Sequence, residues 1–410
     1  MPYINRAIES VFLRLSGEYS ALLLTGSRQT GKTTMLLKLL DEEGIGREYV
    51  SLDDPVLRHL AKTEPAMFFQ LHPPPIFIDE AQYAPELFPY IKMMADRDQV
   101  PGAFWLSGSQ IFRMMRGIQE SLAGRVALLH LPPLSQMELY SSGQVTPFVV
   151  DLEMLKARQS MATSATVTEV YERIFHGSMP ALRSGRYSDG DAFYRNYIGT
   201  YLDRDVKELS PTIDSLKFLN FLTASAALTA QFVNYKAYAE QCDVDQKTAK
   251  DWLRILEALG IIFYLRPYSN NTLKRMVKTP KLYFYDCGLV AFLTKWSSPE
   301  ALQNGAMSGA ILENFVVSEI LKGYQNHGRE PYLYYYRDRD AREIDLMLEM
   351  DGQLSPLEIK KTANPGSPLV RVFQLLDRAG LKRGMGAVVC MTEHLGAIDG
   401  ENLIVPAWMV

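Results

Sequence analysis

Gly26-Ser27-Arg28-Gln29-Thr30-Gly31-Lys32-Thr33 is the stretch that decides the fold, because it fits G-x-x-x-x-G-K-[ST] at every fixed position. An apolar segment, Ala21–Leu24, runs into it, and a helix-forming segment, Thr34–Leu40, leads out of it. In such a strand–loop–helix unit the backbone N–H groups wrap a polyphosphate and the helix N-terminus adds partial positive charge. The alternative, a glycine-containing turn that binds nothing, is disfavoured because both flanking elements are in place.

The side chains of this phosphate-binding loop (P-loop) have defined chemical roles. Lys32 places a positive charge at the β- and γ-phosphates, and the Thr33 hydroxyl is a ligand for Mg²⁺. We therefore predict a nucleoside triphosphate site formed by Gly26, Ser27, Arg28, Gln29, Thr30, Gly31, Lys32, Thr33 and Thr34.

A second motif, Ile76-Phe77-Ile78-Asp79-Glu80, follows downstream. Its apolar residues predict a buried parallel strand, and ligands bind at the carboxyl ends of such strands. We expect Asp79 to hold Mg²⁺, directly or through water, and Glu80 to orient and deprotonate the attacking water. A further strand, Ala103–Leu106, ends in Ser107-Gly108-Ser109-Gln110, where a polar side chain can contact the γ-phosphate; an ordinary loop is the equal alternative.

The order of these motifs resembles the AAA ATPases, and the resemblance implies ATP and Mg²⁺ as cofactors. It also implies that Ser109 is the first nucleotide sensor, with Ser107 as its rival. The group uses an arginine supplied in trans to the γ-phosphate, which implies a homo-oligomer. Arg125 is the first choice for that arginine and Arg113 and Arg116 are its rivals; the alternative for each is a solvated surface residue.

Length and composition limit the class of protein. The chain has 410 residues, so two to four domains are expected, and its net charge of −4 gives no global basic field for nucleic acid. Its three cysteines are far apart and form no C-x-x-C pair, which fits a reducing cytoplasm. No signal-peptide or membrane-spanning run is found, and the histidines show no metal-ligand spacing.

The middle of the chain predicts helices and a possible DNA-binding module. Residues 141–210 read as a helical lid or linker, in which Arg204 is either a second nucleotide sensor or part of a solvated helix face. Residues 211–300 show a winged-helix pattern, with a helix from Gln246 to Leu259 capped by Asp245. The basic residues on that helix and near the wing could contact a DNA backbone, and packing or oligomerisation is the equal alternative; they are Lys247, Lys250, Arg254, Lys274, Arg275, Lys278 and Lys281.

The C-terminal part, residues 301–410, contains the second chemical signal. Glu343–Met350 and Leu354–Lys360 predict two strands joined by an Asp351-Gly352 turn, which places Met350 opposite Gln353 and sets the register of the pair. In that register the polar residues Glu343, Asp345, Glu358 and Lys360 share one face, and Ile344, Leu346, Leu357 and Ile359 share the other.

Carboxylates and a lysine on one sheet face resemble the PD-(D/E)XK nuclease core. The resemblance implies a metal site formed by Asp345 and Glu358, with Lys360 beside it and Glu313 on a preceding helix. The alternative is a surface salt-bridge ladder on an amphipathic hairpin. Such folds are also kept for binding alone, so a nuclease-like fold does not by itself imply cleavage.

The whole chain resembles bacterial and archaeal ATPases that join an AAA module to a C-terminal domain of unknown function. The implied fold class is α/β: an AAA-type P-loop domain with a parallel sheet (1–140), a helical lid or linker (141–210), a winged-helix domain (211–300) and a nuclease-like α/β domain (301–410). We expect a cytoplasmic, Mg²⁺-dependent ATPase that couples hydrolysis to DNA binding or remodelling. The alternatives are an ATP-gated metal-dependent nuclease and an ATP-dependent signalling switch that binds only protein. The stretches that carry this resemblance are Gly26–Thr33, Ile78–Glu80, Gly108–Ser109, Gly124–Arg125, Tyr201–Val206, Lys278–Asp286 and Glu358–Lys360.

Overall fold

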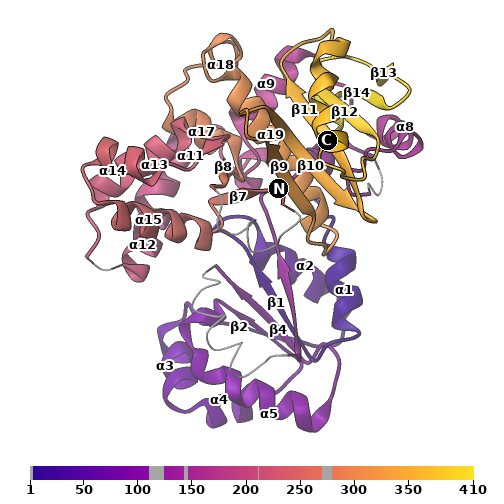
Figure 1. Cartoon of the computed structure of the whole chain (residues 1–410). Coiled ribbons are helices and arrows are strands. Elements are labelled where there is room, and N and C mark those ends of the chain that lie inside the picture. The colour runs from indigo at the N-terminus through magenta and orange to yellow at the C-terminus, as the bar shows by residue number, and fades with distance from the viewer. Residues whose placement is uncertain (1–2, 110–123, 143–145, 211, 270–278) are drawn as a thin grey trace.

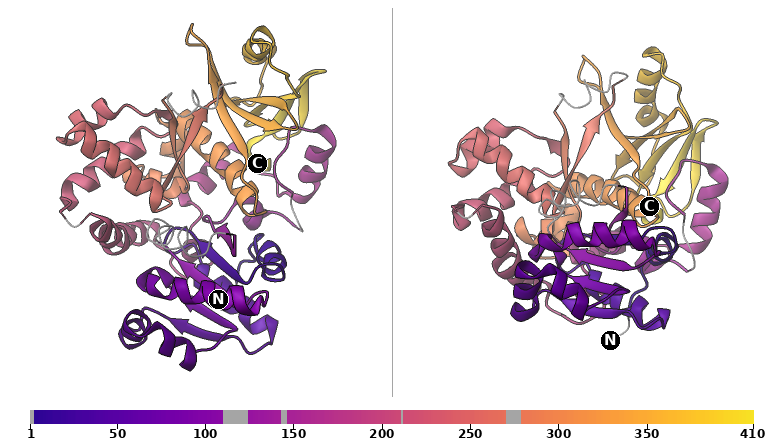
Figure 2. Two further views of the ribbon diagram at one scale, coloured as in Figure 1. Left: turned by 60° about the horizontal axis from the view of Figure 1, so that its bottom comes forward. Right: turned by 90° about the horizontal axis from the view of Figure 1, so that it is seen from below.

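The computed structural model describes residues 3–109, 124–142, 146–210, 212–269 and 279–410. The chain forms two lobes, with the N-terminal lobe below and the larger remainder above in Figure 1. The left view of Figure 2 shows the same division.

A parallel sheet of five strands, in the order β2-β3-β4-β1-β5, is the centre of the N-terminal lobe. It confirms the predicted parallel α/β sheet. Because all strands run the same way, the carboxyl ends of β1, β3 and β4 meet at one edge of the sheet. The strands are β1 (Ala21–Thr25), β2 (Glu48–Ser51), β3 (Ile76–Asp79), β4 (Phe104–Gly108) and β5 (Val126–His130).

Both faces of this sheet are covered by helices. Alternate residues of β1 belong to separate cores, Leu22 and Leu24 to one and Ala21 and Leu23 to the other, which explains why the strand is apolar throughout. The helices of this lobe are α1 (Glu9–Ser16), α2 (Lys32–Glu43), α3 (Pro55–Thr63), α4 (Pro65–Leu71), η1 (Ala81–Tyr83), η2 (Pro85–Leu87), α5 (Phe88–Asp98) and α7 (Gln136–Tyr140).

The segment from 146 to 210 contains helices and no strand among its described residues, and its role as a lid or linker stays a prediction. The tyrosine-rich pattern near residue 190 forms a helix that continues through one π-helical turn, η3 (Tyr197–Leu202), into α12. A π-helical turn is often found at functional sites. The remaining helices are α8 (Leu152–Met161), α9 (Val167–His176), α10 (Pro180–Arg183), α11 (Gly190–Asn196) and α12 (Asp203–Leu209).

Three helices and an antiparallel strand pair follow. The Asp245 side chain accepts a hydrogen bond of 2.8 Å from Thr248 N, so it caps the predicted helix. Trp252 and Leu253 on that helix are buried, as the pattern indicates. The predicted basic residues Lys274, Arg275 and Lys278 lie outside the described residues. The elements are α13 (Ser215–Ala227), β6 (Gln231–Phe232), α14 (Tyr235–Cys242), α15 (Gln246–Ala258), β7 (Ile262–Pro267) and β8 (Lys281–Phe284).

A mixed sheet of nine strands, in the order β13-β14-β12-β11-β10-β9-β7-β8-β6, forms the larger lobe. Strands β7 and β9 are parallel neighbours, so segments 211–300 and 301–410, which we predicted as two domains, share one sheet. They also share one hydrophobic core. The further elements are α17 (Cys287–Leu293), α18 (Pro299–Asn304), α19 (Ser308–Gln325), β9 (Tyr332–Arg337), β10 (Glu343–Met350), β11 (Gln353–Lys360), η4 (Ser367–Phe373), α20 (Gln374–Arg378), β12 (Gly386–Cys390), β13 (Gly396–Asp399), β14 (Asn402–Pro406) and η5 (Ala407–Met409).

The predicted register of the β10–β11 hairpin is confirmed, with Met350 opposite Gln353 and Leu346 opposite Leu357. The prediction that Ile344 lies on the same face of the hairpin as Leu346 is wrong. Ile344 packs in a different core cluster from Leu346, because the pairing of β10 with β9 shifts register between Ile344 and Met347 and breaks strict alternation. In the part of the chain that is described, no helix is both long enough and apolar enough to cross a membrane.

Candidate functional site

The P-loop leaves β1 at the carboxyl edge of the parallel sheet. Gly26 has φ +149° and Gly31 has φ +91°, which are backbone conformations that glycine tolerates. A Cβ atom on Gly26 would lie 2.3 Å from the carbonyl oxygen of Leu131, so a side chain has no room there. Gly31 precedes α2, whose first backbone N–H groups are available to an anion.

Lys32 is the first residue of α2 and is 7% exposed. Its ammonium group donates hydrogen bonds of 2.9 Å to the carbonyl oxygens of Gly26 and Ser27. Burial lowers the Lys32 pKa to about 8, although the charges of Glu80 and Asp79 act in the opposite direction. A buried ammonium that is paired only with carbonyl dipoles is well placed to gain from a phosphate.

Asp79 ends β3 and is buried beside Thr33. Thr33 Oγ1 lies 2.9 and 3.1 Å from the two Asp79 carboxylate oxygens, so the two residues predicted to hold Mg²⁺ are in direct contact. A carboxylate and a hydroxyl together are the oxygen ligands that Mg²⁺ uses next to phosphates. Tyr49 OH also donates to Asp79, at 3.2 Å. Sequence reasoning missed Tyr49, whose only signal is its place on a neighbouring strand.

Glu80 follows directly, in a left-handed conformation with φ +57°. Its carboxylate accepts a hydrogen bond from the side-chain amide of Gln82. Burial raises the Glu80 pKa, and the charge of Lys32 and the Gln82 hydrogen bond oppose that rise. A carboxylate whose proton affinity is raised by burial is a better general base, which suits the predicted role.

Of the two serines at the end of β4, Ser107 makes the contact with the site. Its hydroxyl donates to Asp79, whereas Ser109 Oγ is buried with no hydrogen-bond partner among the described residues. Ser109, the first choice for the sensor, therefore has an unused polar atom near the site, and its role stays a prediction.

Arg125 lies at the other end of the parallel sheet, immediately before β5. It is partly exposed and forms an ion pair with Asp96. Arg125 therefore lies at the opposite end of the sheet from its own P-loop, and both action in trans and the surface-residue alternative stay predictions. Its rivals Arg113 and Arg116 lie outside the described residues.

Residues that are distant from the P-loop in the sequence also form contacts at the P-loop. Arg28 of the loop forms an ion pair of 2.7 Å with Asp205 of α12, and both side chains are largely buried. The neighbouring Arg204 donates a hydrogen bond of 2.8 Å to Tyr83 OH. Arg6 donates at 2.8 Å to the carbonyl oxygen of Thr30. Sequence reasoning noticed Arg204 but assigned no role to Asp205 or Arg6, because only the fold brings them to the loop.

The C-terminal carboxylates are neutralised by lysine. Lys360 Nζ lies 2.8 Å from an Asp345 oxygen and 2.7 Å from a Glu358 oxygen, so the three predicted residues do come together. Burial, and then the Asp345 charge, raises the Glu358 pKa to about 7. Glu313 is bonded to a second lysine: its carboxylate accepts from Lys281 at 2.5 Å and from Tyr283 at 2.7 Å. Burial, and to a smaller extent the nearby Asp345 charge, raises the Glu313 pKa, and the Lys281 charge opposes that rise.

This arrangement does not fit a bound metal ion. No three His, Cys, Asp or Glu side chains of the described residues are close enough to hold one together. The Lys360 ammonium lies between the two carboxylates where a cation would have to bind. The remaining Glu358 oxygen, Oε1, is buried without a hydrogen-bond partner in the described part of the chain, but one oxygen is not a metal site.

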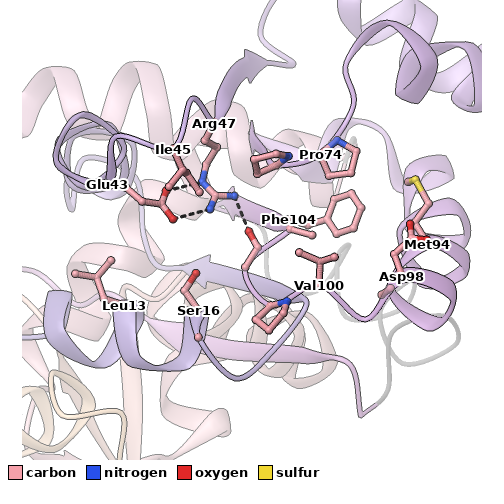
Figure 3. A pocket seen from close by; sticks show the side chains of 16 residues that line it. Leu13, Ser16, Glu43, Ile45, Arg47, Pro74, Met94, Asp98, Val100 and Phe104 are labelled. Atoms are coloured by element: carbon pink, nitrogen blue, oxygen red, sulfur yellow. Dashed lines mark hydrogen bonds and ion pairs between the residues drawn. The ribbon is translucent and has the colours of Figure 1, made fainter.

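A cavity of about 400 Å³ opens elsewhere on the N-terminal lobe, at the amino ends of β3 and β4 (Figure 3). Its walls are mainly apolar, with Val100 and Phe104 among them. The buried Arg47 guanidinium in its wall is already bonded to Glu43 and to the carbonyl oxygen of Gly102. The cavity is therefore distinct from the P-loop and offers no comparable anion site.

The basic side chains of α15 are exposed on the side opposite its buried residues. Lys247, Lys250 and Arg254 are all exposed, and Arg254 pairs with Asp251 at 3.0 Å. They form a small positive surface, which we call the α15 basic face.

Three family models match three separate parts of the chain. Residues 18–140 match the family model of an AAA domain, residues 167–300 match a domain of unknown function (DUF8612), and residues 308–410 match another (DUF4143). Two relatives are 29% identical over 388 residues, which is 94% of this chain and 80% of each relative. They are "Uncharacterized protein Mb2031c" of Mycobacterium bovis and "Uncharacterized protein Rv2008c" of Mycobacterium tuberculosis.

The chain is also similar to two solved structures, each at 16% sequence identity. The Walker-type ATPase PABY2304 of Pyrococcus abyssi aligns with 71% of this chain and 96% of its own, with a TM-score of 0.43. The RuvB Holliday junction branch migration motor of Thermotoga maritima aligns with 63% and 89%, with a TM-score of 0.31. The family matches and the geometry of the loop support a P-loop ATPase module at residues 18–140, in one chain with a C-terminal segment, 308–410, that matches the DUF4143 family model.

Proposed function

We propose that this protein hydrolyses ATP at the P-loop and uses the hydrolysis to control DNA binding by its C-terminal half. The observation that carries the first step is the contact of Thr33 with Asp79 at 2.9 Å, beside the buried Lys32. Thr33 and Asp79 would hold Mg²⁺, which neutralises phosphate charge when it is bound. Glu80 is the proposed base for the attacking water.

The test is ATP turnover by the full chain, with two variants. Lys32→Ala removes the charge at the phosphates and should abolish nucleotide binding or hydrolysis. Glu80→Gln should bind ATP but turn it over at least about 100-fold more slowly, because the base is lost while the binding groups stay.

Glu86→Gln is the matched control, because Glu86 undergoes the same chemical change on the exposed side of η2. It should keep wild-type turnover. Wild-type turnover by Glu80→Gln would show that the base is assigned to the wrong residue.

The DNA part of the proposal is supported by the order of elements from α13 to β8. Three helices, the last with an exposed basic face, are followed by two antiparallel strands, β7 and β8, and this order of elements is consistent with the proposed winged helix. Lys247, Lys250 and Arg254 would contact phosphates from α15. Such contacts carry no sequence information, so affinity for duplexes of different sequence should be similar.

A titration of labelled duplex DNA across salt concentrations tests this step. Backbone binding must weaken steeply as salt rises, and Lys247→Glu with Lys250→Glu should remove it. Lys62→Glu, an exposed charge reversal on the N-terminal lobe, is the matched control. Absence of DNA binding would leave the third hypothesis, a nucleotide switch that binds only protein.

The nuclease alternative depends on the β10–β11 hairpin. Its confirmed register and the meeting of Asp345, Glu358 and Lys360 favour a nuclease-like fold, whereas their mutual neutralisation favours a domain used for binding. Cleavage dependent on Mg²⁺ or Mn²⁺ that disappears in Asp345→Ala would establish a nuclease. If single-stranded, duplex and branched DNA all remain intact in the presence of these metals, the nuclease alternative is excluded.

A further inference from the structure

Helix α12 contacts the nucleotide site at two points. Asp205 pairs with Arg28 of the P-loop at 2.7 Å, with side-chain exposures of 5% and 12%. One residue earlier, Arg204 donates to Tyr83, which ends the short helix η1 that follows Glu80. The two motifs of the ATPase site are therefore both held by the same turn of α12, on the side of the larger lobe that faces the N-terminal lobe (Figure 1).

The Asp205 carboxylate is in electrostatic conflict with a nucleotide. It is 4% exposed, and its Oδ1 atom is buried without a hydrogen-bond partner among the described residues. The loop that its other oxygen contacts is the one that wraps a polyphosphate. Two anionic groups in a poorly solvated site repel each other strongly, so a triphosphate and the paired Asp205 do not coexist without cost.

Arg28 is the group for which the two anions compete. Arginine binds phosphate through two parallel N–H donors, so a bound triphosphate offers the Arg28 guanidinium a partner of higher charge than one carboxylate. Lys32 must make a similar change, since its ammonium is bonded to the Gly26 and Ser27 carbonyl oxygens of its own loop. A nucleotide would therefore compete with contacts that Arg28 and Lys32 make within the described structure.

We infer that the Arg28–Asp205 ion pair is a latch, which holds α12 on the empty P-loop and is opened by ATP. This inference rests on the proposed function, because it describes how nucleotide occupancy of that same site is regulated and transmitted. Opening the latch removes one of the two contacts that hold α12 on the site, and the turn that precedes α12, η3, is π-helical. Helices α12 and α13 are consecutive elements, so the movement leads directly into the proposed DNA-binding segment.

The first measurement is hydrogen–deuterium exchange of the full wild-type chain with and without Mg²⁺·ATP. The latch predicts that amides of 203–209 exchange faster when ATP is present, at least about threefold, while the P-loop itself becomes protected. Greater protection of α12 with ATP would overturn the latch. This measurement needs no variant, so it stands even if the substitutions below impair folding.

The second measurement is ATP affinity, read from the fluorescence of a labelled ATP, for Asp205→Asn and Asp191→Asn. Asp205→Asn should bind about tenfold more tightly, because it removes both the repulsion and the competing partner of Arg28. It should also show the fast α12 exchange without nucleotide. Asp191→Asn is the matched control, since it makes the same chemical change at an exposed residue in the first turn of α11, and it should bind as the wild type does.

The two hypotheses fail in different ways. Unchanged ATP binding and unchanged ATP turnover in Lys32→Ala would show that the P-loop is not the nucleotide site, and the proposed function would fall. Loss of binding or turnover in Lys32→Ala together with wild-type or weaker binding in Asp205→Asn would keep the ATPase site and overturn the latch.

Discussion

The P-loop site and the carboxylate cluster of the β10–β11 hairpin contain the same kinds of residue in opposite arrangements. At the P-loop, Lys32 is bonded to carbonyl oxygens and Asp79 to hydroxyl groups, so acid and base are not paired with each other. In the hairpin, Lys360 lies within 2.8 Å of both Asp345 and Glu358. Lys32 and Asp79 of the first site are therefore available for a ligand, although Arg28 of the same loop is paired with Asp205, whereas all three charged groups of the second site are paired with one another.

The comparison shows that residue type does not by itself identify a site of chemistry. What separates the two sites is the backbone: the P-loop turns glycines and N–H groups towards a ligand, and the hairpin holds its polar side chains in register on adjacent strands. The lysine in the hairpin then takes the place of an external cation.

The largest expected effect distinguishes the two carboxylates. Asp79→Asn should lower ATP turnover by about 1,000-fold, because it removes the charged ligand proposed for Mg²⁺. Asp345→Asn, the same change in the other site, should leave turnover within about twofold of wild type. Turnover measured at saturating ATP over a range of Mg²⁺ concentrations checks both, and a comparable loss in Asp345→Asn would break the comparison.

Substitution of the two lysines should have the reverse order of effects on stability, with the larger loss at the hairpin. Lys360→Met leaves two buried carboxylates without their cation and should lower the free energy of unfolding by about 3 kcal/mol at pH 8. Lys32→Met removes no carboxylate partner and should cost about 1 kcal/mol or less. Urea unfolding of both variants gives the two values.

The Lys360→Met defect should be smaller in acid. The Glu358 pKa is raised to about 7 in the folded protein, so between its unfolded value near 4.5 and pH 7 the folded state binds the extra proton. Stability from this group is therefore present at low pH and is lost as pH rises through 7. A defect that grows below pH 6 would contradict the described cluster.

The next effect in size is that of ligands on the free energy of unfolding. Mg²⁺ with ATP at 100 times its dissociation constant should raise the free energy of unfolding by about 2.7 kcal/mol, through binding to the folded P-loop. Mg²⁺ alone should change the melting temperature by less than about 1 °C, because no described trio of side chains holds a metal ion. A clear rise with Mg²⁺ alone that disappears in Glu358→Gln would restore the nuclease hypothesis.

Local pattern was enough to predict the nucleotide site, because the P-loop and the strand ending in Asp79 are continuous stretches whose backbone geometry follows from their residues. The hairpin register was predictable for the same reason, since a two-residue turn fixes it. The break in alternation at Ile344 was not, because it arises from pairing with β9. Nor was Asp205, which meets Arg28 only through the packing of α12 on the loop.

The smallest expected effect concerns pH, which should change the stability contributed by the two sites in opposite directions. His130 ends β5 near the P-loop, and burial, followed by the Lys32 charge, lowers its pKa to about 4. Between pH 6.5 and 4 the unfolded chain therefore binds a proton that the folded protein does not, so stability falls with acid. His130→Gln should remove about 2 kcal/mol of the loss between pH 7 and pH 4, as measured by urea unfolding. Acid thus lowers the free energy of unfolding through His130, whereas rising pH lowers it through Glu358, because the folded protein disfavours the charged form of each side chain. An unchanged acid slope in His130→Gln would show that His130 is protonated in the folded state.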